Sequence, residues 1–198
     1  MADRFDWAFR IQFLYGSDAR YLKSIGLLDL ITDDTVQPDI PELWFLAHFP
    51  ISGNAGGLDL KLGEFMTCFG ADMSDPRRNV FYSRDYIFNF GCPFHGTGAL
   101  LTLHVAPDLD VYAGIDRGVN VALEDNNDAP SFYGGAMMNC CKGKVCCAAM
   151  THAGPENPRD NHGYRYLSDV LTTWKVTDRI TSITDLNYAY AILFDLRG

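Results

Sequence analysis

The chain reads, from residue 5 to residue 16, Phe5-Asp6-Trp7-Ala8-Phe9-Arg10-Ile11-Gln12-Phe13-Leu14-Tyr15-Gly16. Every odd position in this stretch holds a large apolar side chain, whereas its charged and amide side chains stand at even positions. Successive side chains of a β-strand point to opposite faces, so the pattern predicts a strand with one apolar and one polar face. The stretch is about twice as long as an ordinary strand. It matches the length that a tilted strand needs to cross a bilayer.

The composition of the chain excludes several classes of protein. Its 198 residues carry a net charge of −9 with 16 lysines and arginines, which is a poor basis for binding nucleic-acid phosphates. Hydrophobic residues make up 47% of the chain, too many for a disordered protein. No run of 18 apolar residues is present, so we expect no transmembrane helix. The first four residues do not resemble a signal peptide, so we expect that an export signal has been removed or that the chain is incomplete.

Strand-like alternation returns along the whole chain. Residues 40–51 and 58–65 alternate around a glycine-rich turn, as in a hairpin of two amphipathic strands. Six more strand patterns follow, at residues 97–106, 108–118, 131–141, 144–153, 164–176 and 179–190.

The connections between these patterns alternate between tight turns and long polar loops, such as residues 152–163. We therefore expect a single all-β domain over residues 1–198: an antiparallel up-and-down transmembrane β-barrel, or a large part of one, with about nine strands. Its long loops should lie at one rim, and the longest is an aromatic loop at 66–96. Because such barrels usually have an even number of strands, we expect further strands, a second copy or partner chains to cover the open edges.

Several motifs resemble those of a known family. They are found at residues 57–65, 82–91, 93–98, 118–128, 152–156 and 174–181, and include Tyr82-Ser83-Arg84 and Asp125-Asn126-Asn127-Asp128. In this order they resemble the β-barrel porins of Gram-negative outer membranes of the "porin-2" type. The resemblance spans roughly residues 8–190 and implies an outer-membrane barrel with a water-filled lumen, of which this chain is the N-terminal portion.

Within a barrel, the alternation divides the side chains into three candidate groups. Candidates for lining a pore are Asp6, Arg10, Gln12, Glu42, His48, Asp59, Lys61, Asp108 and Asp110. Candidates for facing lipid are Phe5, Trp7, Phe9, Ile11, Phe13, Leu43, Phe45 and Phe49. Candidates for a constriction, if loop 66–96 folds inward, are Asp75, Arg77, Arg78, Arg84 and Asp85. The alternative for that loop is packing on the outer rim, and alternation alone does not say which face is inside.

Metal and cysteine chemistry find less support in the sequence. Asp125 and Asp128 are candidate calcium ligands, but the glycine and distal glutamate of a helix-loop-helix calcium site are absent, so a solvated loop is favoured. His152 and His162 flank a loop with two acidic residues and are a weaker metal pair. Four cysteines surround a Lys-Gly-Lys turn, namely Cys140, Cys141, Cys146 and Cys147. Their spacing does not fit a zinc site, which leaves small apolar filler or a cross-hairpin disulfide.

The sequence favours a non-enzymatic channel for passive diffusion of small hydrophilic solutes or ions. No nucleophile elbow, phosphate loop or dinucleotide fingerprint is present, and no cofactor is expected. Expected partners are the lipid bilayer with its lipopolysaccharide, the solutes or ions, and a further copy or partner chain, but no nucleic acid. Two alternatives stay open: a β-barrel scaffold of a surface assembly, and a soluble all-β binding protein whose aromatic face is its core.

Overall fold

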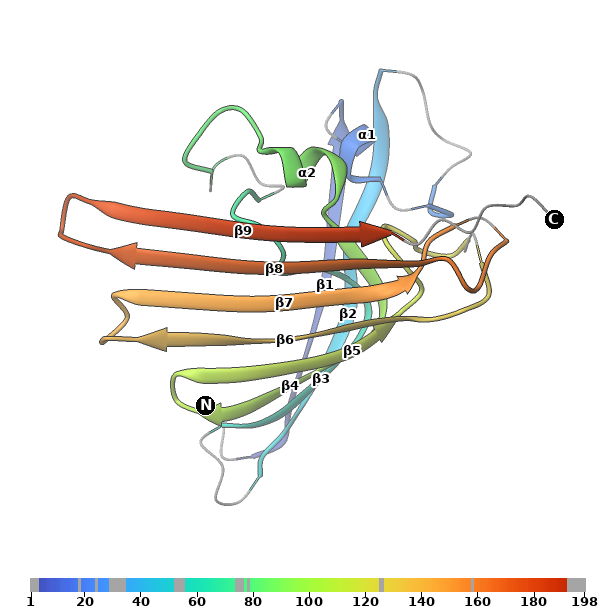
Figure 1. Ribbon diagram of the computed structural model, residues 1–198. Coiled ribbons are helices and arrows are strands. Elements are labelled where there is room, and N and C mark those ends of the chain that lie inside the picture. Colours follow the sequence, from blue (N-terminus) through green and yellow to red (C-terminus); the bar gives the residue numbers. More distant parts are fainter. Residues whose placement is uncertain are drawn as a thin grey trace.

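A computed structural model shows one antiparallel sheet (Figure 1). It describes residues 4–17, 19–23, 25–28, 35–51, 56–73, 77, 79–124, 127–157 and 159–191. Within them the strands and short helices are β1 (Asp6–Gly16), α1 (Ala19–Leu22), β2 (Gln37–Phe49), β3 (Gly57–Met66), α2 (Tyr86–Phe90), β4 (His95–Ala106), β5 (Leu109–Asp116), β6 (Ser131–Cys140), β7 (Val145–Pro155), β8 (Tyr164–Lys175) and β9 (Thr181–Ala191).

The sheet has the up-and-down topology expected from the sequence. Its order is β1 to β9 without a crossover, and each strand pairs with the next one in the chain. β1 and β9 stand at the two ends of this order, so the sheet is curved but not closed (Figure 1). The predicted fold class, a transmembrane β-barrel or a large part of one, is therefore confirmed. No helix among the described residues is long and apolar enough to span a bilayer.

Long and short connections lie at opposite rims of the sheet. The strands β1, β3, β5 and β7 end at one rim, where long connections follow them, and we call it the long-loop rim. The strands β2, β4, β6 and β8 end at the other rim, where short connections follow them, and we call it the short-turn rim. This is the arrangement expected of an up-and-down barrel.

The pairing register carries one apolar face across the strands. Phe9 lies opposite Phe45, and Phe45 lies opposite Leu62, so the odd positions of β1 and β2 share a face with the even positions of β3. Large side chains on this face are exposed, as shown by 65% for Phe9 and 73% for Phe13. All eight candidates for facing lipid stand here; the Phe5 ring packs edge-on against Phe49, with ring centres 5.6 Å apart. We call this surface the apolar face.

The opposite face of the sheet is concave and holds the hydrophobic core. One buried cluster joins strand residues with two residues of the β3–β4 connection; its members are Phe65, Phe69, Cys92, Leu100, Tyr133, Met150 and Leu167. Because β3 and β8 are five strands apart in the sheet, a shared cluster requires the sheet to curve around it. We call this surface the concave face.

Two local details differ from the sequence prediction. β5 begins at Leu109 rather than at 108, so Asp108 lies in the tight turn at the short-turn rim and not on a strand face. β2 begins at Gln37, three residues before the start of the strand pattern predicted at residues 40–51. A register shift between Gln12 and Leu14 accommodates this extension, since a bulge lets the longer strand follow its partner.

Candidate functional site on the concave face

Charged and amide side chains of the first three strands gather on the concave face. Arg10 on β1 forms an ion pair with Glu42 on β2, and its guanidinium also donates to Gln12 Oε1 over 2.9 Å. Lys61 on β3 lies over the Trp44 ring, with its Nζ 4.9 Å from the ring centre. The register thus places the candidates of β1–β3 on one surface, opposite the aromatic side chains.

The connection between β3 and β4 folds onto this same face. Gly70 N donates to Asp169 Oδ2 on β8 over 2.9 Å, and Ala71 N donates to Asp185 Oδ2 on β9 over 2.7 Å. Farther along the connection, Arg165 on β8 donates to the Phe90 carbonyl oxygen over 3.4 Å. Segment 67–94 therefore lies inside the curve of the sheet, held by strands that follow it by about a hundred residues in the chain.

Segment 67–94 has its own internal order. Asp85 caps the short helix α2 by accepting from Phe88 N over 2.7 Å, and its own N–H donates to Asp72 Oδ2 over 2.7 Å. The Arg84 guanidinium stacks 4.5 Å from the centre of the Phe88 ring and donates to the Met73 carbonyl oxygen. These contacts give the middle of the segment a defined shape.

Burial raises the pKa of three groups in segment 67–94. Desolvation raises the pKa of the Cys68 thiol, and it raises the pKa of the Cys92 thiol to about 12, with the nearby Asp169 adding to the effect. Cys92 is consequently a neutral thiol at physiological pH and packs as a small hydrophobe in the core cluster. Desolvation also raises the pKa of Asp85, against the lowering effect of its hydrogen bond from Phe88.

The constriction candidates fall partly within the described chain. Arg84 and Asp85 lie in the ordered part of segment 67–94, and Arg77 is an exposed residue of the same segment. Asp75 and Arg78 lie outside the described residues.

A second polar group lies on the concave face near the short-turn rim. His48 Nδ1 is 2.6 Å from Asp59 Oδ1, and His104 Nε2 is 3.2 Å from Asp59 Oδ2. The other ring nitrogen of His104, Nδ1, is 2.6 Å from Asp110 Oδ1. The two histidines thus share the carboxylate of Asp59. The carboxylate of Asp110 contacts the other ring nitrogen of His104.

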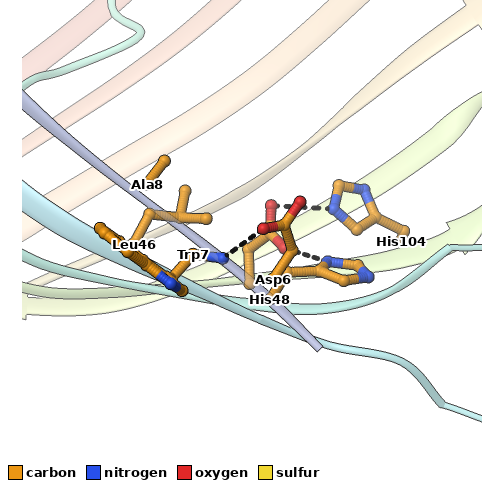
Figure 2. A pocket seen from close by; sticks show the side chains of 7 residues that line it. Asp6, Trp7, Ala8, Leu46, His48 and His104 are labelled. Atoms are coloured by element: carbon orange, nitrogen blue, oxygen red, sulfur yellow. Dashed lines mark hydrogen bonds and ion pairs between the residues drawn. The ribbon is translucent and has the colours of Figure 1, made fainter. Parts of the chain in front are cut away.

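A pocket of about 320 Å³ adjoins these side chains. Figure 2 shows Asp6, His48 and His104 at one end of it and Ala8 and Leu46 at the other. Sequence reasoning selected Asp6, His48, Asp59 and Asp110 as polar-face residues but overlooked His104. Its place in the strand could have identified it. His104 lies opposite Asp110 in the β4–β5 hairpin, so it shares the polar face of that residue.

A third polar group lies at the long-loop rim. His152 Nε2 is 3.2 Å from Asp116, whose Oδ1 also accepts from Gly118 N over 2.9 Å. Glu156 accepts from Val119 N over 3.2 Å, and burial raises the pKa of its carboxyl. His152 is therefore buried against Asp116, whereas His162 is exposed in the next loop.

The candidate calcium ligands and the four cysteines near the β6–β7 turn do not form a metal site or a disulfide among the described residues. Asp128 is exposed, and Asp125 lies outside the described residues. Cys140 pairs in register with Val145 at the end of the β6–β7 hairpin, and Cys141 occupies the turn with a φ of 57°. All six cysteines of the chain are free thiols in the structure.

The family comparison agrees with this architecture. The model of the family described as "Putative beta-barrel porin-2, OmpL-like" matches residues 2–191. No curated protein matches the chain. Among solved structures, the outer membrane channel DcaP of Acinetobacter baumannii is similar, with a TM-score of 0.47 and 12% sequence identity over 94% of this chain. The match covers 64% of the DcaP chain, so this chain spans less than two thirds of its length. On the family match, which extends over nearly the whole sequence, the chain belongs to the porin-2, OmpL-like family of β-barrel porins.

Proposed function

We propose that the chain forms the wall of a porin-type channel in the bacterial outer membrane, through which small hydrophilic solutes or ions diffuse passively. One observation supports this most directly: the same strands present aromatic and aliphatic side chains on one face and charged side chains on the other. Lipid requires an apolar surface, and a water-filled lumen requires a polar one. The proposed process breaks no covalent bond and needs no catalytic group.

The apolar face serves as the lipid contact in this proposal. Its exposed side chains extend from β1, through Leu62 on β3 and Ile115 on β5, to Leu186 on β9. Neighbouring strands are hydrogen-bonded to one another in order from β1 to β9, which pairs the backbone groups between them as a bilayer demands, apart from register shifts between β1 and β2 and between β4 and β5. A soluble protein that used this face as its core would bury Phe9 and Phe13, which here are among the exposed side chains.

The concave face serves as the solute path. Arg10, Lys61 and Asp59 contribute charges of both signs to one wall, and rings of fixed charge select ions by sign. Segment 67–94 narrows the lumen, because it lies against the inner sides of β6, β8 and β9. Arg77, Arg84 and Asp85 are the groups of that segment that set its local field.

A scaffold role is the second candidate, and it has its own observation. Segment 67–94 exposes several aromatic side chains; their exposed fractions are 74% for Phe81, 78% for Tyr86 and 68% for Phe90. Exposed aromatic side chains are typical of binding sites for other proteins. In this alternative, a partner would sit on the segment and fill the lumen.

Two measurements test the proposal in sequence. Membranes from cells that produce the full-length protein are first extracted with carbonate and then with detergent; release by detergent only supports the barrel, and release by carbonate contradicts it. The purified protein is then reconstituted in planar bilayers. Stepwise conductance in salt supports a channel. The scaffold is supported by a different result: the protein is extracted by detergent and shows no conductance, but a second protein co-purifies with it. Substitution of Phe81 and Tyr86 by serine should then remove that second protein.

A further inference from the structure

We propose that His48, Asp59 and His104 bind one divalent transition-metal ion on the concave face, at the short-turn rim. One ligand atom from each side chain lies within 4.8 Å of the other two. The three residues come from three adjacent strands, β2, β3 and β4, so the sheet itself sets their spacing. This proposal does not depend on the proposed channel function, because the site is formed by these three side chains alone.

The distances between ligand atoms fit a small metal ion. A tetrahedral zinc ion with bonds of about 2.0–2.1 Å needs ligand atoms roughly 3.3 Å apart. His48 Nδ1 lies 2.6 Å from Asp59 Oδ1 and His104 Nε2 lies 3.2 Å from Asp59 Oδ2, and one ligand atom from each of the three side chains lies within 4.8 Å of the other two. An ion can therefore enter with small side-chain shifts and without movement of the strands.

The donor set indicates the class of metal. Two imidazoles and one carboxylate suit zinc, cobalt, nickel and copper, whereas calcium and magnesium prefer oxygen alone. The described lining of the adjoining pocket contains the additional carboxylate of Asp6 and no lysine or arginine. The pocket thus offers a dication a negatively charged environment and an open coordination position for water or a fourth ligand.

Asp110 supplies the outer support that metal-binding histidines use. Its Oδ1 is 2.6 Å from His104 Nδ1, on the side of the ring that faces away from Asp59. A carboxylate on Nδ1 fixes the tautomer that leaves Nε2 free to bind a metal, and it makes the ring more basic. Asp110 is a positioning residue in this proposal and does not contact the ion.

The test is zinc titration of the untagged, full-length protein, folded in detergent and stripped with a chelator. Calorimetry should give one zinc ion per chain, and cobalt should give visible absorption of tetrahedral type. His104→Gln should abolish both signals, whereas His162→Gln, the same change at an exposed loop histidine, should leave them unchanged. Equal binding by the two variants, or no binding by the wild type at micromolar zinc, would overturn the proposal.

If His104→Gln fails to fold, a second pair of variants tests whether the site binds zinc. Asp110→Asn keeps the shape of the supporting residue and should weaken zinc binding by about 10–100-fold. Asp108→Asn makes the same change in the exposed turn two residues earlier and should have no effect. Identical zinc affinities for the two asparagine variants would contradict the assigned role of Asp110 and, with it, the site.

Discussion

The apolar face and the concave face are built from the same strands, but their side chains make different kinds of contact. On the apolar face, side chains such as Phe9 and Phe45 contact neighbours on adjacent strands, and each position needs only to be apolar. On the concave face, side chains have partners far away in the chain, as when Asp169 accepts from Gly70. The comparison shows that one face depends on a class of residue, whereas the other depends on particular residues.

This difference predicts how each face responds to substitution. If the apolar face contacts lipid as proposed, a change of polarity on it should affect insertion of the whole sheet, because every strand would share the bilayer. A change on the concave face affects one contact, one segment or one charge. The largest effects are therefore expected on the apolar face.

Phe9→Arg should cause the largest loss. An arginine on the lipid side near the middle of a bilayer costs roughly 2–4 kcal/mol, enough to prevent assembly of many chains. Phe13→Arg should behave similarly but more mildly if it lies nearer the interface. The measurement is the yield of folded, detergent-extracted protein and its unfolding free energy in lipid vesicles.

The control for Phe9→Arg is Gln12→Arg, which places the same side chain on the polar face of the same strand, beside Glu42. It should fold at wild-type yield. Equal yields for Phe9→Arg and Gln12→Arg would show that the two faces of β1 do not differ in environment.

Asp185→Ala should release one end of segment 67–94. It removes the acceptor of the 2.7 Å hydrogen bond from Ala71 N. Such a bond to a charged group stabilises by about 1–2 kcal/mol at a half-exposed position. We expect an intact barrel whose segment is cut faster by trypsin at Arg77 or Arg84, together with larger or noisier conductance steps.

Asp178→Ala, in the turn between β8 and β9, is the matched control, since it removes a carboxylate far from the segment. If trypsin cleaves both variants at the wild-type rate, the hydrogen bond to Ala71 does not hold the segment in place.

The apolar face of the first two strands could be predicted from the sequence. Alternation is a local property, so the odd positions of residues 5–13 and of residues 43–49 were assigned to one face, as the structure has them. Turn residues also act locally, which is why most strand ends fell within two or three residues of their observed positions. Asp108 was misplaced because a two-residue turn and the first residue of a strand look alike in sequence.

The arrangement on the concave face could be predicted only in part. The alternation of polar residues identified His48, Asp59 and Asp110 separately as residues of the polar face. That they lie together with His104 depends on the register of four strands. Likewise, the loop at 66–96 showed its length and aromatic content, but its anchors on β8 and β9 lie about a hundred residues away. Such pairings depend on sheet curvature, which no local pattern encodes.

Arg10→Glu should leave the fold intact and change ion preference, provided that the concave face lines a channel. It replaces the ion pair between the exposed Arg10 side chain and the buried Glu42 carboxylate by two negative charges. The reversal potential in a salt gradient should shift towards cation preference. Arg179→Glu, in the exposed β8–β9 turn, makes the same charge change away from that face and should shift it less. Equal shifts would remove Arg10 from the solute path.

The smallest effect is expected at Glu156, at the long-loop rim. Burial raises the pKa of this carboxyl above its ordinary value of 4.5, so the folded state binds the proton more tightly than the unfolded state does. The stabilisation from protonation is therefore complete below about pH 4.5 and is lost as the pH rises through the higher, folded pKa. Exchange of the Val119 amide, which donates to Glu156, should become faster over this interval in the wild type, because the desolvation cost of the buried carboxylate exceeds the gain from its hydrogen bond with Val119. Glu156→Gln cannot titrate, so its exchange, corrected for the intrinsic rate, should be flat with pH; a wild-type curve that is equally flat would place the carboxyl in a solvated environment. Because the group is only half-buried, this local effect should leave the apolar face and the unfolding of the whole sheet unchanged.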